Sequence, residues 1–180
     1  MPYDAQWKIE FEKIKIMINH CIGDIIFKIE HVGSTSIEGL SAKPVIDIDV
    51  VMDSYDDLPI IKERLGNIGY KHEGNLGIEG REAFRRTEGD DGIMNYHLYV
   101  CPKDGTGYLE HIAFRDYLRS NETAKKEYGD LKLRLADLYR NDIDLYCENK
   151  TEFVTEILNR TLYLKVQPRK SVLDGAAKDE

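Results

Sequence analysis

The sequence predicts an α+β fold in which helices pack on one side of a mixed β-sheet and a helical part follows. Strand-like segments dominate the first half of the chain, and from about Tyr108 onward apolar residues recur with the 3.6-residue period of helices. Strands first and helices last are typical of an α+β domain rather than of alternating βαβ units. The length of 180 residues fits one domain, since domains have about 100 to 200 residues.

We expect a single domain over residues 1–166, with a sheet-bearing part of about residues 1–105 and a helical part of about residues 106–166. The helical part is expected to cover the sheet and not to carry a second function. Residues 167–180 lose the helical periodicity, so they are predicted to form a flexible tail.

The first elements follow from apolar spacing and turn residues. Apolar residues three and four positions apart predict an amphipathic helix over Asp4–Cys21. Ile25–Val32 is predicted to be a strand, and it runs into a turn at Gly33-Ser34 that opens a short helical turn. Lys43-Pro44 sets the chain extended before Val45–Val51, the clearest strand pattern in the sequence.

The middle of the chain is predicted to form a helix and a hairpin. Pro59 fits the first turn of that helix. A connection then carries three glycines, Gly74, Gly77 and Gly80. Glu82–Thr87 and Ile93–Cys101 are predicted to pair as an antiparallel hairpin around the turn-rich segment Glu88–Gly92.

Composition excludes several classes of protein. Lys and Arg number 25 against 33 Asp and Glu, and the net charge of −8 disfavours indiscriminate polyanion binding while leaving room for one small phosphate site. No segment approaches the roughly 18 apolar residues of a membrane span, and charged residues occupy the N-terminus where a signal peptide needs an apolar run. We therefore expect a cytoplasmic protein without membrane partners.

The strongest chemical signal is the pair Asp47 and Asp49. Residues i and i+2 of a strand project to the same face, so the two carboxylates point one way while Ile46 and Ile48 point into the core. Their Cα atoms are expected about 6.6 Å apart, a separation at which two carboxylates can hold Mg²⁺ or Mn²⁺. The alternative is that both aspartates simply lie on the solvent-exposed face of an edge strand.

A second signal precedes this strand. Gly33-Ser34 ends one strand and opens a helical turn, so backbone N–H groups and a hydroxyl gather where a phosphate can bind. A short helix returning to a neighbouring strand would bring Ser34 and Asp47 to the same end of the sheet. A Gly-Ser pair can equally be a turn without ligand.

The segment His31–Val50, which reads HVGSTSIEGLSAKPVIDIDV, resembles the signature of the GrpB (UPF0157) family of the nucleotidyltransferase superfamily. Similar residues continue over roughly Tyr3–Leu164, for example at Tyr96–Val100 and Phe114–Arg119. The resemblance implies a nucleotidyltransferase-like sheet and transfer of a nucleotidyl group from a nucleoside triphosphate to an acceptor. It also implies that Ser34 binds phosphate and that Asp47 and Asp49 bind Mg²⁺.

Two departures from this pattern concern one strand. Superfamily members usually add a third carboxylate from a neighbouring strand, but the site-facing residues predicted here are Asn95, His97 and Tyr99. Relatives commonly have a second histidine where this chain has Tyr99. His97 is a candidate general base, metal ligand or substrate contact, with a structural hydrogen-bonding role as the alternative. Glu30 and Asp104 are the fallback carboxylates.

The predicted nucleotide- and phosphate-binding residues are Gly33, Ser34, Ser36, Lys43 and Arg81. Lys43 can reach a phosphate from between the loop and the aspartates, or it can be simply solvated. Arg81 is a plausible triphosphate clamp, whereas a charged hairpin surface is favoured for Arg85 and Arg86. His31 is expected to support the glycine turn by packing or hydrogen bonding.

The leading hypothesis is a Mg²⁺-dependent nucleotidyltransferase that acts on a small-molecule or protein acceptor, with a long nucleic acid disfavoured by the net charge. One rival is a non-catalytic nucleotide-binding module of the same fold. The other is a metal-dependent phosphoester hydrolase, in which water would be the acceptor. The sequence names neither the acceptor nor the preferred base nor the oligomeric state.

Overall fold

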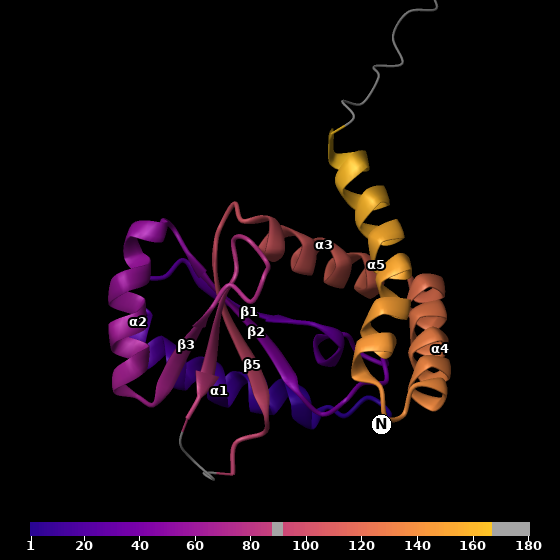
Figure 1. Cartoon of the computed structure of the whole chain (residues 1–180), viewed down its shortest axis with the longest axis horizontal. Coiled ribbons are helices and arrows are strands. Elements are labelled where there is room, and N and C mark those ends of the chain that lie inside the picture. The colour runs from indigo at the N-terminus through magenta and orange to yellow at the C-terminus, as the bar shows by residue number, and fades with distance from the viewer. Residues whose placement is uncertain (88–91, 167–180) are drawn as a thin grey trace, which may run out of the picture.

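A computed structural model describes residues 1–87 and 92–166, and it contains one five-stranded sheet with the strand order β1-β2-β5-β4-β3 (Figure 1). The strands are β1 (Lys28–Val32), β2 (Ile46–Met52), β3 (Tyr70–Gly74), β4 (Glu82–Arg86) and β5 (Tyr96–Pro102). The helices are α1 (Gln6–Ile22), α2 (Leu58–Asn67), α3 (Thr106–Ser120), α4 (Glu122–Leu138) and α5 (Ile143–Val166), with two 3-10 turns, η1 (Ser34–Ser36) and η2 (Tyr55–Asp57).

The sheet is mixed, as predicted. β2 and β5 run parallel, whereas the β1–β2, β5–β4 and β4–β3 pairs are antiparallel. The predicted hairpin is confirmed by the pairing of β4 with β5, in which Ala83 lies opposite Tyr99. Its turn includes residues 88–91, which lie outside the described residues, as does the predicted tail 167–180.

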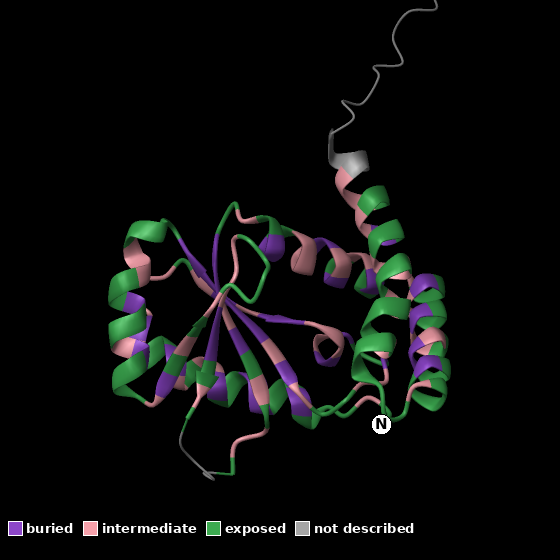
Figure 2. Cartoon of the chain, in the orientation of Figure 1, coloured by how far each residue is buried: buried purple, intermediate pink, exposed green. Residues whose placement is uncertain are grey.

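One face of the sheet carries the main core. The buried residues of α1 and α2 pack against the alternate residues Ile46, Ile48 and Val50 of β2, all of them inaccessible to solvent (Figure 2). Helix α3 crosses part of the opposite face, where Tyr108 packs with Val51 and Cys101. Helices α4 and α5 stand beside α3 at the end of the sheet that starts with β1 (Figure 1). The α+β prediction is therefore confirmed, with the difference that helices lie on both faces of the sheet and not on one side only.

Strand β3 differs from the sequence prediction, in which Gly74 belongs to a glycine-containing connection. Only Tyr70 is buried in this short strand, which lies at the edge of the sheet, so the segment lacks the apolar alternation of a half-buried strand. Its pairing with β4 comes instead from backbone hydrogen bonds, which leave little trace in the side-chain pattern. None of the helices within the described ranges is long and apolar enough to cross a membrane.

Two isoleucines of α1 provide a matched test of the core. Ile14 is completely buried, whereas Ile16 is 69% exposed. We expect Ile14→Ala to lower the free energy of unfolding by about 2–5 kcal/mol, because it leaves a cavity. Ile16→Ala should change it by less than about 0.5 kcal/mol. Urea denaturation followed by circular dichroism measures both, and equal losses would contradict this orientation of α1.

Candidate functional site

The backbone at Gly33 lies directly against the Asp47 side chain. Gly33 joins β1 to η1 with φ +66° and ψ −173°, a conformation that essentially only glycine adopts. A Cβ atom built at this position would lie 2.1 Å from Oδ2 of Asp47. The glycine therefore permits both the turn and the close approach of the loop to the carboxylate.

A buried hydrogen-bond chain holds this loop in place. The Thr35 hydroxyl donates to the carbonyl of Val45 at 3.3 Å, so it accepts a hydrogen bond from Nε2 of His31 at 3.0 Å. The His31 ring stacks on Phe11 with a centroid separation of 4.7 Å. Burial lowers the pKa of His31 to about 4, so the ring is neutral at pH 7 and supports the loop.

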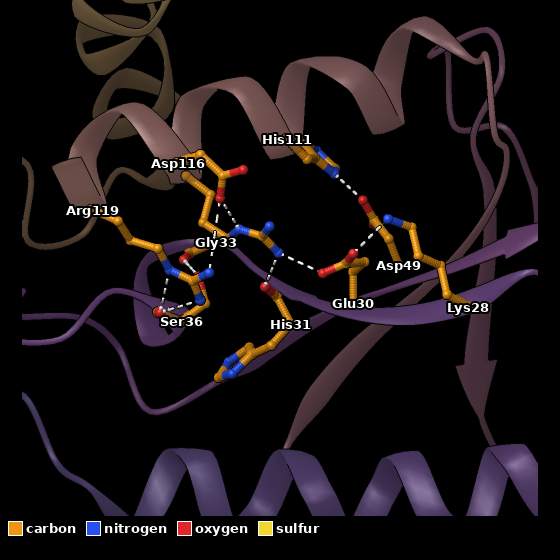
Figure 3. Close-up of polar contacts among 10 residues, drawn as sticks. Lys28, Glu30, His31, Gly33, Ser36, Asp49, His111, Asp116 and Arg119 are labelled. Carbon is orange, nitrogen blue, oxygen red and sulfur yellow. Dashed lines mark hydrogen bonds and ion pairs between the residues drawn. The ribbon is translucent and has the colours of Figure 1, made fainter.

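Asp47 and Asp49 project from the same face of β2, and each contacts one histidine. Oδ1 of Asp47 accepts from Nδ1 of His97 at 2.9 Å, and this bond raises the pKa of the histidine. Oδ2 of Asp49 lies 2.8 Å from Nδ1 of His111, a residue of α3 (Figure 3). Because β2 lies between β1 and β5, the two aspartates are not on an edge strand.

Asp49 is completely buried, so a negative charge on its carboxylate carries a large desolvation penalty. Burial raises the pKa of Asp49, and the hydrogen bond to His111 only partly offsets this effect. Burial alone would lower the pKa of His111, but the bond and the charge of Asp49 outweigh it and raise that pKa. The pair therefore holds its proton tightly.

The oxygen donors of Asp47 and Asp49 are of the kind that a divalent cation such as Mg²⁺ takes. Oδ1 of Asp49 is buried and has no hydrogen-bond partner among the described residues, so it is free to serve as a ligand. No cluster of three or more His, Cys, Asp or Glu side chains within residues 1–87 and 92–166 could hold a metal ion. Mg²⁺ is commonly bound by only one or two carboxylates together with substrate phosphates, which matches this donor set.

The fallback carboxylates are placed differently. Glu30 pairs with Asp49 across β1 and β2, but it forms ion pairs with Lys28 and Arg115, both at 2.8 Å (Figure 3). Asp104 is exposed just beyond the carboxyl end of β5, whereas Asp47 pairs with His97 near the start of that strand. On β5, the strand neighbours of Asp47 and Asp49 are His97 and Tyr99, two of the residues that the sequence predicts to face the site.

A cavity of about 1000 Å³ opens beside Asp47, and we call it the Asp47 cavity. Ser34, Lys43, Arg81 and His97, all predicted site residues, line it together with Asp47. Its other cationic residues are Lys132, Arg140 and Lys150. Five Lys or Arg residues against one Asp make the cavity strongly cationic in a chain whose net charge is −8. Such a lining favours an anionic ligand.

Ser36 does not line the Asp47 cavity in this arrangement. Its hydroxyl donates to the carbonyl of Gly33 at 2.7 Å, which stabilises the turn. Its own carbonyl accepts from Arg119 of α3, at 2.7 Å from Nη2 (Figure 3). Arg85 and Arg86 line a second cavity of about 740 Å³, which shares His97 and Tyr99 with the first.

Lys132 of α4 is a site residue that the sequence reasoning missed. Its Nζ donates to Oγ of Ser34 at 2.9 Å and to the carbonyl of Ser41 at 2.7 Å. Burial, together with the positive charge of Lys150, lowers the pKa of Lys132 to about 8. Lys132 follows Tyr128 by four residues and precedes Leu135 by three, so its spacing places it on the buried face of α4. A lysine on a buried helix face needs a partner, and this spacing is the sequence feature that could have identified it.

His111 was missed for a similar reason. It follows Tyr108 by three residues and precedes Arg115 by four, so it belongs to the buried face of α3. From the sequence, Arg115 and Arg119 are expected on a solvated helix face, but Arg115 is buried because its guanidinium pairs with Glu30. Two polar residues on the buried face of α3 contact the sheet. His111 bonds to Asp49, and Arg115 bonds to Glu30.

Comparison with known proteins gives both relatives and structural neighbours. A family model described as "GrpB protein" matches residues 1–160. The "Glutamate-rich protein GrpB" of Alkalihalophilus pseudofirmus is 40% identical over 161 residues, which cover 88% of this chain and 92% of that protein. The "UPF0157 protein YqkA" of Bacillus subtilis is 33% identical over 152 residues, 84% of this chain but only 43% of its own length.

One solved structure agrees with this grouping, and others share the fold. The crystal structure of GrpB from Enterococcus faecalis has a TM-score of 0.79 and 30% sequence identity, covering 93% of this chain and 99% of that one. Cid1 in complex with the UTP analogue UMPNPP has a TM-score of 0.53 and 13% identity, covering 76% of this chain and 42% of Cid1. The likeness to Cid1 concerns the fold alone.

The contact between Gly33 and Asp47 leads to a stability prediction. Gly33→Ala should lower the free energy of unfolding by more than the roughly 1–3 kcal/mol of backbone strain, because the new methyl group also meets Asp47. Gly77→Ala is the control, since Gly77 has φ +80° with open space where the methyl would lie. Urea denaturation compares them, and equal losses would show that the contact with Asp47 is unimportant.

Proposed function

The chain belongs to the GrpB family, and from this premise we propose that it is a Mg²⁺- or Mn²⁺-dependent nucleotidyltransferase that uses a nucleoside triphosphate. The observation that carries the proposal is the Asp47 cavity, which gathers five cationic side chains beside Asp47, one member of the carboxylate pair, in an acidic chain. A cavity of about 1000 Å³ is large enough for a nucleotide. We expect this activity in the cytoplasm.

The triphosphate would bind along the cationic wall of the cavity. Lys132, already hydrogen-bonded to Ser34, presents an ammonium group at the glycine loop. Lys150 raises the local positive charge, and it lies 5.2 Å from the Tyr146 ring, with Lys43 at 5.5 Å from the same ring. Lysines held this way lose less side-chain entropy on binding than free surface lysines do.

Asp47 and Asp49 would hold Mg²⁺ or Mn²⁺ through the carboxylate oxygens that the histidines leave free. When bound, the cation neutralises phosphate charge and activates the attacking oxygen. The two aspartates would hold the cation in a fixed position, because Asp47 is packed against the Gly33 backbone and Asp49 is fixed by His111. Positioning and electrostatics carry most of the work in phosphoryl-type transfers.

His97 would take the proton of the acceptor. Its Nδ1 bonds to Asp47, which fixes the ring and leaves Nε2 for a second partner. Its side chain is 58% exposed and lines both cavities, so an acceptor can approach it from solvent. We propose a small molecule or a protein as acceptor, because the cations lie inside one cavity of a chain with net charge −8.

A non-catalytic nucleotide-binding module is a second candidate. It is favoured by one observation, that Glu30, the cross-strand neighbour of Asp49, is neutralised by two ion pairs and cannot readily act as a third carboxylate ligand. Such a module would bind the triphosphate through the same lysines without turnover. The fold alone does not distinguish the two functions.

Calorimetric titration with each ribonucleoside triphosphate and Mg²⁺ tests binding, and transfer of an α-phosphate label to candidate acceptors, with pyrophosphate release, tests catalysis. Binding with transfer supports the proposal. Binding without turnover favours the module, and pyrophosphate or phosphate release without a nucleotidylated product favours a hydrolase. If no triphosphate binds, the proposed function is wrong.

Asp47→Asn should weaken Mg²⁺-dependent triphosphate binding by roughly tenfold or more, the equivalent of about 1.4 kcal/mol, and should abolish transfer. The amide keeps the shape of the side chain but removes the charge that attracts the cation. Asp53→Asn, just beyond the end of β2 and 57% exposed, is the matched control and should change neither quantity. An unchanged affinity in Asp47→Asn, with Mg²⁺ present, would refute the metal assignment.

The lowered pKa of Lys132 predicts a pH dependence. The ammonium is half-protonated at about pH 8 and loses its remaining charge as the pH rises further, so triphosphate affinity should fall by roughly threefold to tenfold between about pH 7.5 and 9.5. Calorimetry across this range measures it. Lys132→Arg should flatten the profile because arginine stays protonated. A profile with the same slope in both proteins would exclude Lys132 as the titrating group.

A further inference from the structure

Arg81 stacks on the aromatic ring of Tyr99 at the wall of the Asp47 cavity. Its Cζ atom lies 4.3 Å from the centroid of the Tyr99 ring, a close cation–π distance. Tyr99 belongs to β5, where it is the strand neighbour of Asp49 on one side and of Ala83 on the other. The stack therefore fixes a guanidinium next to the strand that carries both aspartates.

The backbone that carries Arg81 is also fixed. Gly80, the residue before it, has φ +74° and packs against the loop that precedes α3. A Cβ atom at Gly105 would lie 3.1 Å from the carbonyl of Gly80 and 2.8 Å from Pro102, so a side chain there would push the segment away. At Gly107 the built Cβ would lie 3.5 Å from Cβ of Arg81, in ordinary contact.

One donor of Arg81 has nothing to bind. Its Nε is buried, and no residue in the described part of the chain accepts its hydrogen bond. A buried donor without a partner is unfavourable and marks a place where a ligand atom can supply the missing acceptor. Guanidinium groups bind phosphate and carboxylate through two parallel N–H donors, of which Nε is commonly one.

We propose that Tyr99 is a positioning residue, whose ring holds the Arg81 guanidinium for a phosphate oxygen of the triphosphate beside Asp47. The inference rests on the proposed function for the identity of the ligand. It adds a role for Tyr99, a residue that touches Arg81 and not the phosphate. The aromatic face is what matters in this role, and the phenolic hydroxyl is dispensable.

Calorimetry with Mg²⁺ and the triphosphate that binds the wild-type protein most tightly tests this role. Tyr99→Leu should weaken binding about tenfold, and Tyr99→Phe, which keeps the ring, should stay within about twofold of wild type. Arg81→Ala should weaken binding at least as much as Tyr99→Leu. Arg85→Ala, an exposed arginine outside the Asp47 cavity, is the matched control and should have no effect.

The double variant Arg81→Ala/Tyr99→Leu separates positioning from a general structural role. If Tyr99 acts through Arg81, the double variant binds no more weakly than Arg81→Ala alone. Additive losses would overturn the proposal, and so would a Tyr99→Leu protein that binds like wild type. Should Tyr99→Leu fail to fold, a Tyr99→Phe protein with a tenfold loss would overturn it equally. If the wild-type protein binds no triphosphate, the proposed function fails instead, and thermal melts confirm that each variant is folded.

Discussion

The burial of Asp49 is the constraint on which the architecture of the site depends. A carboxylate without solvent access on a central strand needs a partner from outside the sheet, and His111 of α3 provides it. The same helix is joined to β1 through Arg115, which donates to Glu30 and to the carbonyl of His31. Polar contacts therefore act together with the apolar packing of Tyr108 where the helical part meets this face of the sheet.

The helical part does more than cover the sheet. Helix α3 supplies His111, α4 supplies Lys132, and α5 supplies Tyr146 and Lys150 to the Asp47 cavity or its immediate surroundings. The sheet-bearing part contributes the carboxylates, the glycine loop and Arg81. The two halves of the chain thus divide the charges: the carboxylates are on β2, and three of the five cationic residues of the Asp47 cavity, Lys132, Arg140 and Lys150, belong to the helical part. Neither half contains a complete site.

The parts of the site that could be predicted are those encoded locally. The alternation of β2 gives the faces of Asp47 and Asp49, and the glycine turn before it gives the loop that reaches Asp47. Lys132 and His111 could not be placed in this way, because their partners are 98 and 62 residues distant and helix packing decides which residues meet. Strand β3 could not be predicted, because an edge strand with only one buried residue shows no alternation of apolar and polar residues.

The ammonium of Lys132 already has two partners, Ser34 and the carbonyl of Ser41, before any ligand arrives. A ligand that recruits Lys132 exchanges internal hydrogen bonds for external ones, so only the difference between them appears in the affinity. The exchange therefore favours ligands of high negative charge. An ion with a single negative charge attracts the ammonium little more than the two serine oxygens do, whereas a polyanion attracts it much more strongly. Such an exchange would also remove the hydrogen bonds that join α4 to the 34–41 segment.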